Sequence, residues 1–204
     1  TKEYVEIINM LLAGQPLIYH DKFFNLERGF TLQFQTFRPH IPILIASLAP
    51  ASLRMAARYA DGWLPIWTPI ERLPKVVHDF REEAAQAGRD PAAMLVRSPG
   101  SVTFTHDIER ARLGVRRNLA FYLNGMGVYY YRHLQRLGYR DEVAAIRSAW
   151  AAGRSAAGTE AVPEALGESM TLVTDSVEQA RERLAQQEAA GVDVHQVNVE
   201  LPPA

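Results

Sequence analysis

The sequence has no cysteine among its 204 residues. Disulfide bonds, thiolate catalysis and cysteine-ligated metals are therefore excluded, and the chain is compatible with the reducing cytoplasm, where we expect it to reside. It also lacks any apolar run approaching the ~20 residues that a helix needs to cross a bilayer. We therefore expect no membrane partner.

Net charge is almost absent as well. The formal charge is -1, with 22% charged and 48% hydrophobic residues, which is typical of an ordinary globular domain. The cluster RARLGVRR at 110–117 alternates with apolar residues at helical spacing, so it indicates the solvated face of a helix. Because a nucleic-acid partner would require a concentrated basic surface, we predict none.

Several catalytic motifs are missing too. The chain contains no GxxxxGKS phosphate loop, no HExxH zinc motif and no nucleophile elbow. The six histidines are not spaced as metal ligands, so we predict no metal site. His195, inside the last predicted strand, is best interpreted as a neutral core histidine. GMGVYY at 125–130 begins like a dinucleotide fingerprint, but it follows a helix and not a strand, which argues against that function.

What the sequence does contain is an alternation of strand-like and helix-like segments. The run IPILIASL at 41–48 is apolar on both faces, which is typical of a parallel strand covered by helices. TPIE at 68–71 predicts a capping box that opens a helix. We expect strands at 41–48, 61–66, 93–105 and 192–201, helices at 2–14, 50–60, 68–88 and from 107, a hairpin at 17–26, an irregular segment at 27–40 and a loop at 153–163.

This order predicts an α/β fold with a parallel sheet and right-handed crossovers. Four such strands leave two possibilities open. The sheet is either an open, doubly wound one, or part of a (β/α)8 barrel, which needs eight strands and typically ~250 residues.

The carboxyl end of the first predicted strand carries the most informative residues. The segment from Ser47 to Ser52 is SLAPAS, whose side chains are too small to fill a core. Small residues there let main-chain N–H groups approach a ligand, and the start of the next helix favours an anion such as phosphate. Close packing of a strand–helix corner explains the same residues equally well. At the end of the next strand, Trp63 is expected in the core and Trp67 near a pocket.

The order of several segments resembles the luciferase-like monooxygenase superfamily, and most closely its branch that uses the deazaflavin coenzyme F420. The segments are IPILIASLAP and LRMAARYADGWLP, then AGRDP, AFYLNGMGVYY, VPEAL and LVTDSVEQARERLAQQEAAGVD. Together they cover essentially the whole chain.

This resemblance implies a TIM-type barrel of the bacterial luciferase-like type. It implies that residues 1–204 form the C-terminal part of a single barrel domain, about strands 5–8 with their helices, and that strands 1–4 are absent. Because relatives place most acid–base side chains in the absent part, no catalytic residue is assigned here. The intact protein is expected to be a homo-oligomer.

The resemblance also implies a cofactor, F420 or alternatively FMN, at the C-terminal face of the barrel. Leu48 and Ala49 depart from the family pattern, in which glycines are common there, and Thr174 replaces a usual glycine. The residues expected to bind the cofactor are Ser47, Leu48, Ala49, Pro50, Ala51, Ser52, Ile66 and Trp67.

The leading hypothesis is therefore an oxidoreductase that moves a hydride between reduced F420 and a small organic substrate. One alternative is an FMN-dependent monooxygenase that activates oxygen with reduced flavin supplied by a flavin reductase. A second is a non-catalytic flavin-binding protein on the same fold. A third is an unrelated α/β enzyme that holds a phosphorylated substrate at the Ser47–Ser52 corner.

Overall fold

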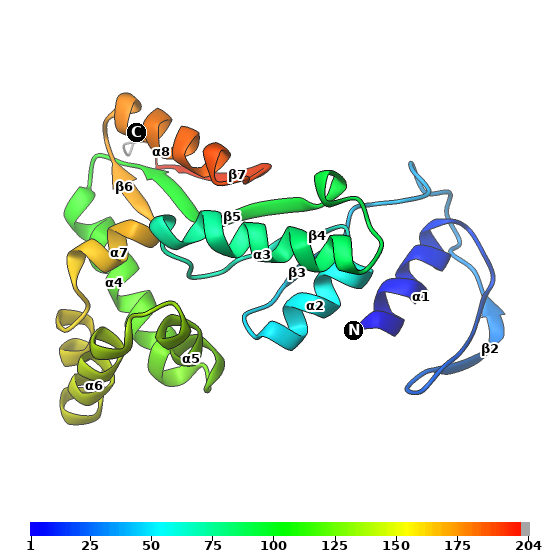
Figure 1. Cartoon of the computed structure of the whole chain (residues 1–204), viewed down its shortest axis with the longest axis horizontal. Coiled ribbons are helices and arrows are strands. Elements are labelled where there is room, and N and C mark those ends of the chain that lie inside the picture. Colours follow the sequence, from blue (N-terminus) through cyan, green and yellow to red (C-terminus); the bar gives the residue numbers. More distant parts are fainter. Residues whose placement is uncertain (201–204) are drawn as a thin grey trace.

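The computed structural model describes residues 1–200, and Figure 1 shows how its helices and strands are arranged. None of the described helices is both long and apolar enough to span a bilayer. The helices are α1 (Lys2–Leu12), α2 (Pro50–Tyr59), α3 (Leu73–Gln86), α4 (Ile108–Gly125), α5 (Tyr129–Arg136), α6 (Arg140–Glu160), α7 (Glu164–Met170) and α8 (Val177–Ala189), with 3-10 turns η1 (Ile70–Arg72) and η2 (Pro91–Ala93). The strands are β1 (Leu17–His20), β2 (Asn25–Phe30), β3 (Leu44–Ala46), β4 (Gly62–Leu64), β5 (Leu95–Phe104), β6 (Leu172–Thr174) and β7 (Val194–Val199).

A parallel sheet forms the centre of the molecule, which confirms the α/β prediction. β3 pairs with β4, β4 with the start of β5, and both β6 and β7 with β5. Because Val102, Thr103 and Phe104 pair with both β6 and β7, those two strands lie on opposite edges of β5. Within residues 1–200, β3 pairs only with β4 and β7 only with β5, so the sheet does not close on itself.

Two hydrophobic cores hold the helices in place. In the first, Trp63 of β4 packs against Phe80 of α3, with ring centroids 5.3 Å apart. The second joins α4, α5, α6 and α7 around fully buried residues such as Leu123 and Ile146. Burying such side chains contributes roughly 1.5–3 kcal/mol each. α5 belongs to this second core and reaches the end of β3, which places it beside the predicted site.

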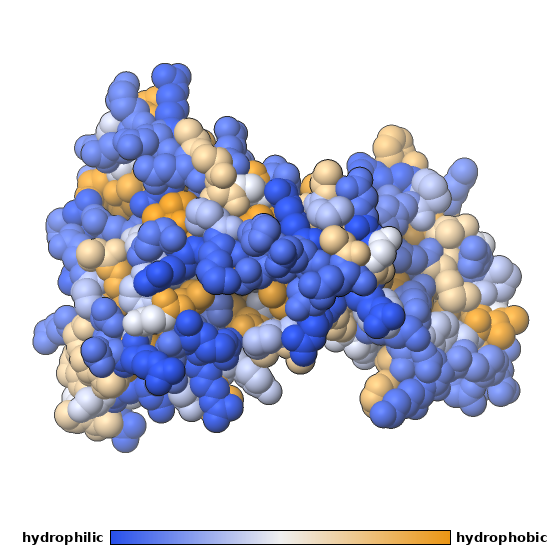
Figure 2. All heavy atoms as spheres, viewed as in Figure 1, coloured by the Kyte–Doolittle hydropathy of each residue, from blue (hydrophilic) through white to orange (hydrophobic). Residues whose placement is uncertain are grey.

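The N-terminal segment forms a lobe that Figures 1 and 2 show on the right, joined to the rest by a narrower waist. α1 packs against a β1–β2 hairpin, and the carboxylate of Glu3 accepts hydrogen bonds from the main-chain N–H groups of Phe23 and Phe24. The hairpin extends to Phe30. The expectation of irregular structure at 27–40 is therefore wrong for residues 27–30.

Two other expectations about local structure are wrong. Thr68 does not cap a helix, because its hydroxyl group pairs with His133 and the next helical turn begins at Ile70 without a side-chain cap. The predicted loop at 153–163 is mostly helical, since α6 continues to Glu160 through a kink. The kink lies at Gly153 and Arg154, whose φ of 57° is left-handed.

The predicted strands are right in position, and those at 93–105 and 192–201 agree with β5 and β7 to within two residues over the described chain, residue 201 lying outside it. The run predicted at 41–48 pairs only over Leu44–Ala46, and Ala46 is exposed, so this strand is not buried on both faces. β5 is irregular around Pro99 and Gly100, where its register against β7 shifts between Arg97 and Ser101. The short strand β6 is not predicted, because three residues carry too little pattern to be recognised.

Candidate functional site

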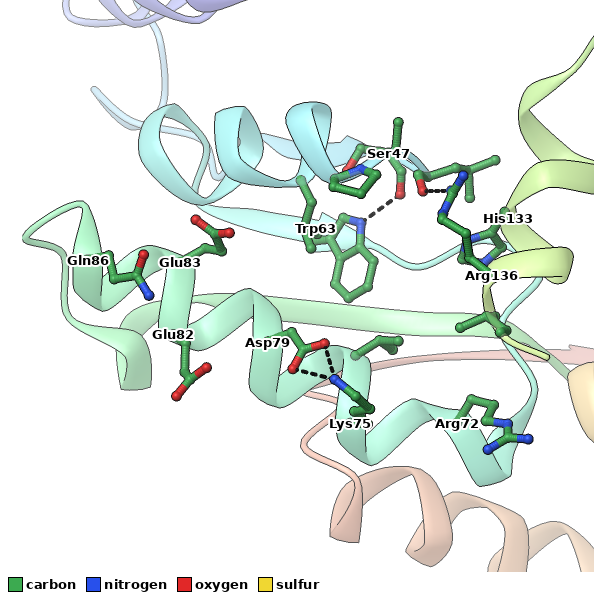
Figure 3. Close-up of a pocket in the computed structure, with 16 residues that line it drawn as sticks. Ser47, Trp63, Arg72, Lys75, Asp79, Glu82, Glu83, Gln86, His133 and Arg136 are labelled. Atoms are coloured by element: carbon green, nitrogen blue, oxygen red, sulfur yellow. Dashed lines mark hydrogen bonds and ion pairs between the residues drawn. The ribbon is translucent and has the colours of Figure 1, made fainter.

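The residues between β3 and α2, which we name the hinge (Ser47–Ala49), are fixed by hydrogen bonds from two other elements. The indole Nε1 of Trp63 donates to the carbonyl oxygen of Ser47 at 3.0 Å, a contact drawn in Figure 3. The guanidinium Nη2 of Arg136, on α5, donates to the carbonyl oxygen of Leu48. Two successive carbonyl groups therefore point away from the start of α2 and toward donors supplied by β4 and α5.

The third hinge carbonyl, that of Ala49, begins α2. It accepts hydrogen bonds from the main-chain N–H of Leu53 and the hydroxyl of Ser52, both at 2.9 Å. Ala49 has no side-chain oxygen to cap the helix, and Pro50 at the first helical position has no N–H. The N–H groups of Ala51 and Ser52 thus carry the partial positive charge of the helix N-terminus without a capping acceptor.

A buried hydroxyl group without a partner lies beside this N-terminus. Ser47 is 6% exposed, and its Oγ makes no hydrogen bond within residues 1–200. An unpaired buried hydroxyl costs on the order of 1–3 kcal/mol. Such a group is retained most readily where a ligand atom completes its hydrogen bonding.

The hinge and the first turn of α2 line a cavity of about 430 Å³, which we name the hinge cavity. Six of the eight residues predicted to bind a cofactor lie around it. The lining residues are Ala46, Ser47, Leu48, Ala49, Ala51, Ser52, Ile66, Tyr129 and Tyr130.

The other two predicted residues are placed differently. Pro50 faces a separate cavity on the opposite side of the hinge. Trp67 does not line the hinge cavity; its ring packs 5.4 Å from that of Tyr122, which in turn contacts Tyr130 at 4.7 Å. Its φ of 54° is left-handed, a strained conformation for a large side chain. Trp67 therefore supports the wall of the hinge cavity through Tyr122.

A buried histidine connects α5 to the end of β4. His133 Nε2 lies 3.2 Å from Thr68 Oγ1, and the two groups share a hydrogen bond. Burial lowers the pKa of His133 from 6.5 to about 4; the positive charge of Arg136 acts in the same direction, and a main-chain hydrogen bond with Leu48 opposes both. The imidazole is neutral near pH 7, so it serves as a fixed hydrogen-bonding group beside the hinge.

The sequence alone does not reveal the contribution of α5 to this site. Neither His133 nor Arg136 stands out there. The local signal is the run YYYRHLQR at 129–136. Burial raises the pKa of Tyr130, and neighbouring Tyr122 adds to the effect, so its hydroxyl stays protonated and can donate to a ligand.

His195, in β7, is only partly buried, so its interpretation as a core histidine is wrong. Its Nδ1 atom lies 2.8 Å from the Oε1 atom of buried Gln187, and its Nε2 atom lies 3.9 Å from the carboxylate of exposed Glu188. Within residues 1–200 no three histidine, aspartate or glutamate side chains gather as a metal site would require.

Residues 1–194 match the luciferase-like monooxygenase family. The chain belongs to this family. The match covers the hinge, the hinge cavity and all the helices α1 to α8, so the resemblance seen in the sequence is confirmed.

Individual relatives support the same family assignment. A predicted coenzyme F420-dependent oxidoreductase of Mycobacterium tuberculosis is 26% identical over 213 residues, which cover 94% of this chain and 60% of the relative. The structure of a coenzyme F420-dependent tetrahydromethanopterin reductase from Methanopyrus kandleri superposes with a TM-score of 0.72 at 21% identity, covering 95% of this chain and 54% of that one. The structure of an F420-dependent secondary alcohol dehydrogenase with an F420–acetone adduct superposes with a TM-score of 0.65 at 17% identity, covering 98% of this chain and 56% of that one.

These comparisons establish the fold. The parallel α/β sheet matches luciferase-like barrel structures over about half their length. The chain likewise spans 60% of the length of the Mycobacterium tuberculosis relative.

Proposed function

We propose that the hinge holds the phosphate-bearing side chain of coenzyme F420, and that the protein is an oxidoreductase moving a hydride between the reduced cofactor and a small organic substrate. One observation carries this proposal. The uncapped N-terminus of α2 and the unpartnered, buried hydroxyl of Ser47 converge on one cavity within residues 1–200. Both are donors, and a phosphate is the acceptor that suits them.

The residues present fit that group. The hydroxyl of Ser47 and the N–H groups of Ala51 and Ser52 would bind phosphate oxygens, and Tyr129 and Tyr130 line the same cavity. Leu48 and Ala49, where relatives have glycine, leave a hinge cavity of about 430 Å³, so their side chains do not close the site. When bound, the deazaflavin supplies the hydride chemistry, which no amino-acid side chain can perform.

The aromatic residues next to the cavity have a complementary role. Tyr130, Tyr122 and Trp67 contact one another in sequence, and they would exclude water from the face where substrate meets cofactor. Ile66 extends this wall into the hinge cavity. The chain thus binds and shields, and the proton-transfer groups remain unassigned.

We also propose a more specific fold, the later half of a (β/α)8 barrel. The parallel strands would form the later half of a (β/α)8 barrel, about its strands 5–8, with the unpaired edges of β3 and β7 meeting the remaining strands. The share of about half of each solved relative that the chain covers supports this assignment.

Titration of the protein with F420 and with FMN, followed by ligand fluorescence, tests the proposal. We expect F420 to bind more tightly than FMN and inorganic phosphate to compete with it. Tighter binding of FMN would favour the FMN-dependent monooxygenase. Phosphate binding without either chromophore would favour an enzyme of phosphorylated substrates, and F420 binding without turnover of any substrate would favour a non-catalytic binding protein.

A further inference from the structure

A second cavity, of about 480 Å³, lies behind the hinge between α2, α3 and α5 (Figure 3). We name it the α2–α3 groove. It shares the residues of the hinge with the hinge cavity. Pro50 and Leu53, however, face the groove, whereas Ala51 and Ser52 face the hinge cavity, so the two spaces lie on opposite sides of the first turn of α2.

The groove is lined by apolar side chains as well as by charged ones. Trp63, which is 3% exposed, presents its indole ring there, and Leu53 and Val76 are partly buried around the same core. Leu137 adds an apolar contact from the end of α5. An aliphatic chain or a ring lying along these side chains would leave water, which favours binding by roughly 25 cal/mol per Å² of apolar surface.

The charges around the groove are not balanced along its length. Arg72 and Arg136 make no ion pair with any carboxylate within residues 1–200. Lys75 and Asp79, between the two ends, neutralise each other at 2.7 Å, and Glu83 lies 4.0 Å from Arg54. The groove is therefore lined by two exposed guanidinium groups without a carboxylate partner in the described chain, that of Arg136 from α5 and that of Arg72 from η1, which lies 5.8 Å from the ring of Tyr139, and by acidic side chains toward its other end (Figure 3).

The hydroxyl of Ser47 is shared with the function proposed above, where it binds the cofactor phosphate, so it is not separate support for a ligand in the groove. It is buried, lacks a hydrogen-bond partner within residues 1–200, and borders the groove as well as the hinge cavity. Because the two arginines have no carboxylate partner in the described chain, an oxygen anion is the ligand group that suits them.

We propose that the α2–α3 groove binds a small amphipathic monocarboxylate. Its carboxylate would pair with Arg136 and Arg72, and its apolar part would lie along Trp63 and Val76. The acidic residues limit its length, because α3 advances only roughly 10 Å from Val76 to Glu83 at about 1.5 Å per residue. A chain of about eight carbons suits that space. No cofactor takes part, and because the hydroxyl of Ser47 already serves the function proposed above, this site rests on the cavity, its apolar side chains and the two arginines.

Calorimetric titration with octanoate tests the site, with octan-1-ol and octylammonium as uncharged and oppositely charged probes. We expect octanoate to bind with a Kd between about 10 μM and 1 mM, and the other two at least about fivefold more weakly. Arg136→Gln and Arg72→Gln should each weaken octanoate binding by about fivefold. Arg117→Gln, an exposed residue of α4 outside the groove, is the matched control and should bind like the parent.

Two variants are used because Arg136 also holds the hinge carbonyl of Leu48, whereas Arg72 does not touch the hinge. Thermal melts of all variants show whether each is folded. Equal binding of octanoate and octan-1-ol would overturn the proposal. So would undiminished octanoate binding by a folded Arg72→Gln variant, or the absence of binding heat at millimolar octanoate.

Discussion

The indole Nε1 of Trp63 donates a hydrogen bond to the carbonyl oxygen of Ser47 across 3.0 Å. This contact joins the end of β4 to the hinge, and its donor is 3% exposed. The carbonyl oxygen of Ser47 points at the indole. The hydroxyl of Ser47 and the N-terminus of α2 lie at the hinge cavity. The site thus depends on a core residue that also packs against Phe80.

Replacing Trp63 with Phe tests this connection. The aromatic packing would be largely kept, but the carbonyl group of Ser47 would lose its donor in a buried place. We expect the free energy of unfolding to fall by about 2 kcal/mol, measured by urea denaturation. An unchanged free energy would mean that water replaces the indole N–H and that the hinge does not depend on this bond.

The stability of the protein should depend on pH through His133. The unfolded chain binds a proton at this side chain below about pH 6.5, whereas the folded chain binds it only below about pH 4. Stability from this group is therefore present above pH 6.5 and is lost as the pH falls toward 4, by about 3 kcal/mol in total. Below pH 4 the loss levels off.

Denaturation of the parent and of His133→Gln at several pH values checks this expectation. The glutamine amide can still bond with Thr68, so the variant should fold. Its free energy of unfolding should fall less steeply between pH 6.5 and 4. Parallel curves for the two proteins would show that His133 is not the origin of the dependence.

Two glycines should respond in opposite ways to alanine. A Cβ at Gly62, in β4, would lie 2.3 Å from the main-chain oxygen of Leu95, while one at Gly114, in α4, meets nothing within 4 Å. We expect Gly62→Ala to cost about 3 kcal/mol or more, because the strands must separate. Gly114→Ala should raise stability by up to about 1 kcal/mol through helix propensity. Urea melts that rank the two variants in the reverse order would contradict the pairing of β4 with β5.

The left-handed backbone of Trp67 predicts an unusual order of variants. Trp67→Gly and Trp67→Ala both remove the contact with Tyr122, but only glycine adopts a φ of 54° without strain. The glycine variant should therefore be the more stable by about 1 kcal/mol. At Trp150, within α6, the order should reverse, because glycine disfavours helix. The same order at both positions, measured by urea denaturation, would show that Trp67 is not strained.

Those parts of the fold that depend on residues close together in the sequence can be predicted from it. The apolar run at 41–48 and the small residues after it indicate a parallel strand followed by a strand–helix corner, and both lie where they are expected. That this corner binds a ligand stays a prediction. The capping role predicted for Thr68 is wrong because its partner, His133, is 65 residues away and no local pattern reports it. The roles of Tyr129 and Arg136 arise in the same way, since tertiary packing alone brings α5 to the hinge.

F420 binding by Ser47→Ala and Ser52→Ala, compared with binding by the parent protein, shows whether the hinge holds the cofactor phosphate. The hydroxyl of Ser47 has no partner within residues 1–200, whereas that of Ser52 already bonds to Ala49. Ser47→Ala should melt at the same or a slightly higher temperature and bind F420 about tenfold more weakly. Ser52→Ala should bind nearly as well as the parent. Undiminished F420 binding by a folded Ser47→Ala variant would contradict the claim that the hinge holds the phosphate.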